Sequence, residues 1–148
     1  MVMPFVGDLV GMQHLAANLR RLTMVASRAS TTGARKIQSL LRKQYRTGQD
    51  PYGNAWAALR PWTLRTHGPP PLTDTGAAKA GTVAKAMRGS GIAITIDAPY
   101  MAFHMTGYLN ARTGTHVPAR PVLPTAALPA SWQQALKDAV GQAMGAIK

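Results

Sequence analysis

The chain contains no cysteine and no glutamate, and its carboxylate side chains are five aspartates. Without cysteine it forms no disulfide framework and no thiolate zinc site, and it has no thiol nucleophile. A chain so poor in carboxylates has little material for paired acid–base catalysis. No apolar run reaches the roughly 18–20 residues that a membrane span requires. We therefore expect a soluble protein that is not an enzyme.

Positive charge is what the sequence has in excess. The 148 residues carry a net charge of +12, and residues 20–88 hold 13 of the 17 lysines and arginines against two of the five aspartates. Such an excess indicates a polyanionic partner or serves solubility alone. The four histidines show no metal-ligand spacing, so we expect neither a metal nor another cofactor. The length fits one domain, residues 1–148.

Helical periodicity dominates the N-terminal third. Apolar residues recur at i, i+3, i+7 and i+10 from Leu9 to Leu19, which predicts a helix over residues 8–24. A second helix is expected over residues 27–46, with Ile37 and Leu41 on its apolar face. The opposite face is basic, and it contacts DNA in transit, contacts an acidic partner, or is simply solvated. Its members are Arg35, Lys36, Arg42, Lys43 and Arg46.

Turns and short strands are expected over residues 47–124. Asp50-Pro51-Tyr52-Gly53 is typical of a turn, and residues 82–88 and 92–96 predict a hairpin around Gly89-Ser90-Gly91. Proline and glycine interrupt long loops, and residues 107–117 are expected to be a mobile loop. Residues 118–124 are too rich in proline for a central strand, so we expect an edge strand or an extended segment there.

A C-terminal helix over about 131–147 is predicted to begin at a capping box of Ser131 and Gln134. We expect the isoleucine face of the hairpin to pack on this helix through Leu136, Val140 and Met144. The predicted fold is thus α+β, a small antiparallel sheet packed against N-terminal and C-terminal helices.

Three segments suggest a chemical or structural role. The run Asp74-Thr75-Gly76 matches the aspartic-protease signature, but prolines precede it where that family has a hydrophobic strand. An aspartic-type hydrolase is therefore the weakest hypothesis, and a turn or helix cap is favoured. His104 lies in an aromatic segment, and we interpret it as a packed or hydrogen-bonded histidine. Arg120 lies between Pro118 and Pro121, so we expect it to contact a carboxylate or a carbonyl, within the chain or between subunits.

Several short motifs, taken together in their order along the chain, indicate a resemblance to a known family that no single motif would indicate. Over residues 30–147, the chain resembles the virion morphogenesis proteins of tailed bacteriophages, which complete the tail at the neck. The motifs follow a basic helix and precede a C-terminal helix. They are Asp50-Pro51-Tyr52-Gly53-Asn54-Ala55-Trp56, Leu59 and Thr63, Leu72-Thr73-Asp74-Thr75-Gly76, Tyr100-Met101-Ala102-Phe103-His104-Met105-Thr106-Gly107, and Pro118-Ala119-Arg120-Pro121-Val122-Leu123.

This resemblance implies a structural subunit of the virion, assembled in the host cytoplasm. It implies a homo-oligomeric ring, for which six copies are expected. The ring would bind the tail tube and head-completion or stopper proteins, and packaged DNA would pass through it. Inter-subunit or structural roles would fall to Trp56, Tyr100, His104 and Arg120. The alternative is a basic DNA-binding accessory protein, because the charge of the second helix suits a nucleic-acid backbone.

Overall fold

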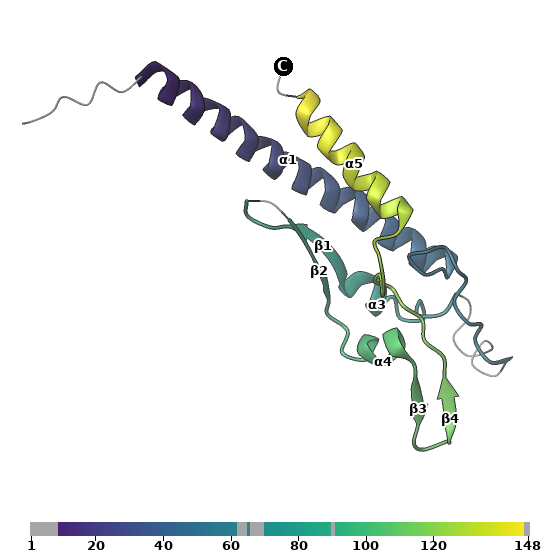
Figure 1. Ribbon diagram of the computed structural model, residues 1–148. Helices are drawn as coiled ribbons and strands as arrows, with labels where there is room; N and C mark the ends of the chain where they lie inside the picture. Colours follow the sequence, from purple (N-terminus) through teal and green to yellow (C-terminus); the bar gives the residue numbers. More distant parts are fainter. Residues whose placement is uncertain (1–8, 62–64, 66–69, 90, 147–148) are drawn as a thin grey trace, which may run out of the picture.

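The computed structural model describes residues 9–61, 65, 70–89 and 91–146, and the fold is α+β. A long N-terminal helix and a C-terminal helix run side by side, and two small antiparallel hairpins complete the chain (Figure 1). The elements are α1 (Leu9–Thr47), α3 (Ala77–Gly81), β1 (Thr82–Ala86), β2 (Ile92–Ile96), α4 (Met101–Thr106), β3 (Tyr108–Asn110), β4 (Thr115–Val117) and α5 (Ala130–Gly145).

The N-terminal third is one continuous helix, so the prediction of two helices was wrong. Residues 25 and 26 are Val and Ala, which do not break a helix, and α1 passes through them without interruption. Ser30 and Thr31 turn their hydroxyls back to the carbonyls four residues earlier. Gly33 also lies inside the helix. A Cβ at this position would stand 2.9 Å from the Ile92 Cδ1 and 3.2 Å from the Leu136 Cδ2, so a larger residue would not fit without adjustment.

The predicted hairpin is confirmed. β1 pairs with β2 in antiparallel register, with Ala84 opposite Ile94, and Gly89 and Gly91 supply the positive φ angles of its turn. A two-stranded hairpin is only marginally stable alone. This hairpin is stabilised because it lies against α1, which carries α5 along another side (Figure 1).

The side chain of Gln38 takes the place of a third strand beside β1. Its Nε2 donates to the Thr82 carbonyl at 3.1 Å, and its Oε1 accepts the Ala84 N–H at 2.7 Å. These bonds satisfy backbone groups on the edge of β1 that faces α1. The edge of this small sheet is thereby fixed to the helix.

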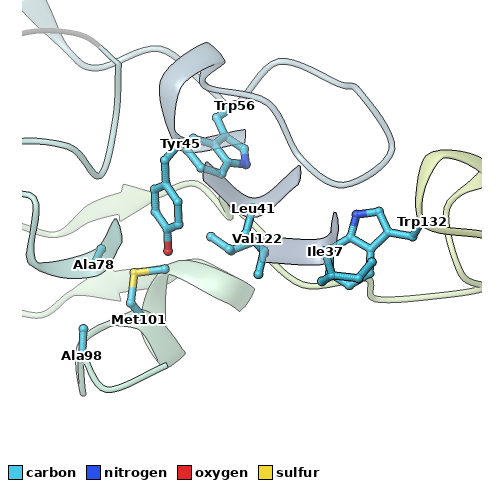
Figure 2. Packing of buried hydrophobic residues seen from close by; sticks show 9 residues of the cluster. All are labelled: Ile37, Leu41, Tyr45, Trp56, Ala78, Ala98, Met101, Val122 and Trp132. Atoms are coloured by element: carbon cyan, nitrogen blue, oxygen red, sulfur yellow. The ribbon is translucent and has the colours of Figure 1, made fainter. Parts of the chain in front are cut away.

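The core lies where the C-terminal half of α1 meets the segments that follow it. Figure 2 shows Tyr45 packed beside Trp56, and their rings meet edge to face at 5.9 Å. The Tyr45 hydroxyl exchanges a 2.8 Å hydrogen bond with the Thr82 hydroxyl, so the polar tip of a buried ring is satisfied. Burial raises the pKa of the Tyr45 phenol. The cluster comprises Ile37, Leu41, Tyr45, Trp56, Ala78, Ala98, Met101, Val122 and Trp132.

The C-terminal helix α5 begins differently from what the sequence predicts. It begins at Ala130 after Pro129, and no side chain caps it, so the capping box of Ser131 and Gln134 was wrong. Gln134 instead donates to Asp138 one turn along the helix. Residues 147 and 148 lie outside the described part of the chain.

The isoleucine face packs mainly on α1 rather than on α5. Val140 and Met144 are exposed, at 45% and 63%, because their side of α5 faces away from the hairpin. Leu136 is the exception, since its side chain and that of Ile92 both reach Gly33 of α1. The predicted packing of the hairpin on α5 therefore holds at Leu136 and was wrong for the other two positions.

The segment expected to be a mobile loop forms a second hairpin. β3 and β4 pair with Tyr108 opposite Val117, and the hairpin projects away from the helices (Figure 1). Asn110 stabilises its turn by accepting the Arg112 N–H at 3.0 Å, and Gly114 adopts a positive φ. These strands were hard to predict because they are only three residues long, and one face of the hairpin is exposed while the other is only half-buried. Residues 118–124 run back toward α5 without forming a strand, so of the two expected alternatives the structure shows the extended segment and not the edge strand.

Candidate functional site

The first candidate feature is the buried arginine of the Pro-Ala-Arg-Pro segment. Arg120 is 5% exposed, and its guanidinium donates to the carbonyls of Ala57 at 3.0 Å and Ala58 at 3.4 Å. Its own N–H donates to the His104 carbonyl at 2.6 Å. Of the contacts expected for Arg120, the structure shows the one to backbone carbonyls of the same chain. The residue joins three segments that are distant in sequence.

Trp56 ends on the same segment as Arg120. Its indole N–H donates to the Pro121 carbonyl at 3.0 Å while its ring packs in the core. The preceding turn is closed by Asp50, whose Oδ1 accepts the N–H groups of Tyr52 and Asn54. The motifs around residues 50–56 and 118–123 therefore meet in space and hold the chain's loops together. Thr63, which belongs to the same pattern, lies outside the described residues.

His104 is packed among aromatic rings, as the sequence suggests. It meets Tyr100 and Tyr108 edge to face, at 6.1 and 6.0 Å between ring centroids. Its Nδ1 is buried and reaches no hydrogen-bond partner within the described part of the chain. Burial, and then the nearby Arg120 cation, lowers the pKa of the imidazole. The neutral ring thus belongs to the packing that supports Arg120.

The five basic residues singled out on α1 do not share one face. Lys36 turns toward α5 and lies 3.8 Å from Asp138, and Lys43 lies beside the start of α5. Arg35 and Arg42 turn toward β1 instead. Arg46 is exposed in the last turn of α1. The helix therefore divides its positive charge between two sides, and one of them borders a groove.

That groove runs between α1 and the hairpin and has a volume of about 1120 Å³. The α1 wall presents Arg35, Gln38 and Arg42, and the opposite wall adds Lys79 of α3 and Lys85 of β1. Sequence reasoning missed both lysines, because nothing in their spacing indicates that they face α1. No carboxylate occurs among the described residues that line the groove. The arrangement can bind an anion of extended shape.

The second surface is the projecting N-terminal part of α1, residues 12–24, which is called the free part of α1 below because all of these residues are exposed. Among the described residues, α1 becomes partly buried from Val25 onward, and further along Arg28 donates to the Ala146 carbonyl and Ser30 accepts the Gly91 N–H. Thirteen residues of helix are about 20 Å long at 1.5 Å per residue. Large apolar side chains stand on this free part, namely Met12, Leu15, Leu19, Leu22 and Met24.

The Asp-Thr-Gly segment forms an exposed turn before α3. Gly76 has a φ of 71°, its N–H bonds the Thr73 carbonyl, and the Thr75 hydroxyl accepts the Ala77 N–H at 3.3 Å. Asp74 itself is exposed. This geometry is the turn that the sequence favours over a protease site.

Comparison with protein-family models, with curated proteins and with solved structures finds no match for the chain. Within the described residues, no group of three or more histidine or aspartate side chains is placed to hold a metal ion. Nor does the part of the chain that the structure describes contain a helix long and apolar enough to cross a membrane.

Proposed function

We propose that the chain is a structural, non-enzymatic subunit of the ring that completes the tail at the head–tail junction of a tailed bacteriophage. Two lines of reasoning support this proposal. The motifs that resemble the virion morphogenesis family occur in the family's order, and the free part of α1 exposes an apolar surface that none of the described residues covers.

The free part of α1 is the observation that carries the proposal. An isolated helix of this length is marginal in water, and large apolar side chains raise the cost of leaving it there. Met12, Leu15, Leu19 and Leu22 fall within about 80° of the helix circumference at 3.6 residues per turn. A stripe of this kind is typical of a helix that is buried against another element.

The stripe also continues the internal packing surface of the protein. Gly33 and Ile37, which pack in the body, project from the same sector of α1 as Leu15 and Leu19 at 3.6 residues per turn. The exposed stripe is thus an extension of the side that binds α5 and the hairpin. We expect a second copy of the chain to cover it, because a copy offers elements that already fit this side of the helix.

Such a contact joins different surfaces of two copies, and a head-to-tail contact that closes by rotation forms a ring. The suspected number of six copies and the neighbours, a tail tube and head-completion or stopper proteins, come from the resemblance. So do passage of DNA through the ring and the location in the virion. A basic DNA-binding accessory protein is the second candidate, and the charge of the groove favours it.

Disruption of the gene in a phage that carries it tests the proposed function. We expect unjoined heads and tails in electron micrographs, and we expect the wild-type gene to restore complete particles. A double variant, Leu15→Glu with Leu19→Glu, should fail to restore them. The matched control, Gln13→Glu with Ala17→Glu, places the same charges on the other side of α1 and should restore them. Complete, infectious particles without the gene would reject the proposal.

A further inference from the structure

We infer that the groove between α1 and β1 binds the sugar–phosphate backbone of duplex DNA without reading its sequence. The inference goes beyond the proposed ring and does not depend on it. The groove begins near Thr31, so none of its residues belongs to the free part of α1.

Four cations border the groove on both of its walls. Arg35 and Arg42 stand two turns apart on α1, about 10 Å along the helix axis. Lys79 and Lys85 face them from α3 and β1, and all four residues are exposed. With no carboxylate among the described lining residues, the groove has one sign of charge throughout. A one-sided field of this kind raises the local concentration of polyanions.

The strand that forms one wall adds one backbone donor to these cations. Asp97 N–H bonds Gly81 O, and Met87 N–H bonds Gly91 O, at the two ends of the hairpin. In an antiparallel pair, hydrogen-bonded and outward-facing residues alternate, so Thr82, Ala84 and Ala86 turn their backbone groups away from β2. Gln38 occupies the Thr82 carbonyl and the Ala84 N–H. The Ala86 N–H therefore points outward beside Lys85, where a phosphate oxygen can accept it.

The same edge geometry disfavours an acidic peptide as the occupant. A peptide that adds to a sheet edge needs consecutive backbone groups of the strand. Gln38 already occupies two of them on β1, so strand addition would have to displace its side chain. Phosphates need only cations and a single N–H donor, and the groove offers both.

The lining also distinguishes duplex from single-stranded DNA. Proteins that bind single strands stack the bases on aromatic side chains. None of the described lining residues is aromatic, so the groove offers charge without a stacking platform. A duplex keeps its bases stacked internally and presents only phosphates, which is what this lining can contact.

The length of the groove sets the expected size of the contact. Five residues of β1 span about 17 Å, which equals about five nucleotide steps at 3.4 Å per step of one strand. Four cations then contact about four phosphates. The logarithm of the affinity should fall against the logarithm of the salt concentration with a slope of about −3.6.

Fluorescence anisotropy with a labelled duplex of about 20 base pairs tests the inference over a series of salt concentrations. The groove variant is Arg42→Gln with Lys79→Gln. The control is Lys43→Gln with Lys137→Gln, which removes the same charge from exposed residues of α1 and α5 that do not line the groove. At about 100 mM salt we expect the groove variant to bind at least about tenfold more weakly and the control less than about threefold. The salt slope of the groove variant should be smaller in magnitude by about 1.8.

Equal losses in the two variants would overturn the inference, because net charge alone would then explain binding. Tighter binding of a poly-glutamate peptide than of the duplex would also overturn it and would assign the groove to an acidic protein. Preference for a single strand of the same length would contradict the backbone contact proposed here. Light scattering on the same samples should give equal masses for both variants. A difference in DNA binding between them then cannot be due to a difference in ring formation.

Discussion

Gln38 completes the hydrogen bonding of Ala84, with its side-chain Oε1 accepting the Ala84 N–H at 2.7 Å. The other end of the same amide donates to the Thr82 carbonyl. A single side chain of α1 therefore replaces the strand that β1 lacks on this side. It couples the orientation of the hairpin to the helix and keeps the edge closed to strand addition.

Gln38→Ala should destabilise the protein by about 1–3 kcal/mol, because two backbone groups of β1 lose their partner. Urea denaturation would measure the loss, and hydrogen exchange should accelerate at the Ala84 amide. Gln13→Ala, in the free part of α1, serves as the control and should leave both quantities unchanged. Unchanged exchange at Ala84 in Gln38→Ala would show that the hydrogen bond does not hold the edge.

Substitution of two glycines that lie within helices should change the stability of the protein in opposite directions. A Cβ at Gly33 would stand 2.9 Å from the Ile92 Cδ1 and 3.2 Å from the Leu136 Cδ2, so Gly33→Leu overfills the contact between α1, β2 and α5. We expect a loss of about 1–3 kcal/mol from such overpacking. Gly141 of α5 has nothing within 4 Å of its Cβ position, and Gly141→Leu should gain up to about 1 kcal/mol from helix propensity.

Thermal unfolding of both glycine variants, followed by circular dichroism, would measure the two changes. A stabilised Gly33→Leu variant would mean that the three elements are not in contact at this point. Both variants replace glycine by leucine, so a difference in sign between the two stability changes reflects the space around each glycine.

The hairpin and the extended segment around Arg120 could be predicted from the sequence for physical reasons. Alternating isoleucines bounded by glycines fix the strand and its turn, and the flanking prolines restrict the backbone of Arg120. The continuity of α1 was predictable in principle, because residues 25 and 26 are Val and Ala, which do not break a helix. The glycine at position 33 was not, because only its contacts with Ile92 and Leu136 explain it.

The groove could be predicted from the sequence only in part. The arginines of α1 have a visible spacing, whereas Lys79 and Lys85 enter the site through the way that β1 lies on α1. Gln38 gives no sequence signal at all, since a glutamine on a helix is ordinarily solvated. Its role depends on a contact between residues 46 positions apart in the chain.

Arg120→Met should destabilise the protein by about 1–3 kcal/mol, since the carbonyls of Ala57 and Ala58 would lose their charged donor. Arg120→Lys should recover only part of the loss, because an ammonium group cannot reproduce the planar guanidinium donors. Urea denaturation would rank the variants. The exposed Arg112 provides the control, and Arg112→Met should change stability little. Equal stability of Arg120→Met and the wild type would refute the structural role of this guanidinium.

Acid should weaken the fold through His104. Its folded pKa lies below the ordinary value of 6.5, so the unfolded chain binds more protons in the interval between the two values. The stabilisation is fully present above pH 6.5 and is lost as the pH falls through the folded pKa. His104→Gln cannot titrate and should show a flatter stability profile over this interval. The free energy of unfolding, measured from pH 7.5 down to about pH 5, checks the sign. An unchanged slope in the variant would contradict the assignment.

The central claim is that the apolar stripe on the free part of α1 is covered by a second copy of the chain. Multi-angle light scattering of the purified protein, over a range of concentrations, tests it most directly. We expect a multiple of the 15.7 kDa monomer mass. The variant with Leu15→Glu and Leu19→Glu should lose that assembly, and the control with Gln13→Glu and Ala17→Glu should retain it. A wild-type protein that remains a monomer at every concentration, with the same mass as the Leu15 and Leu19 variant, would contradict the account.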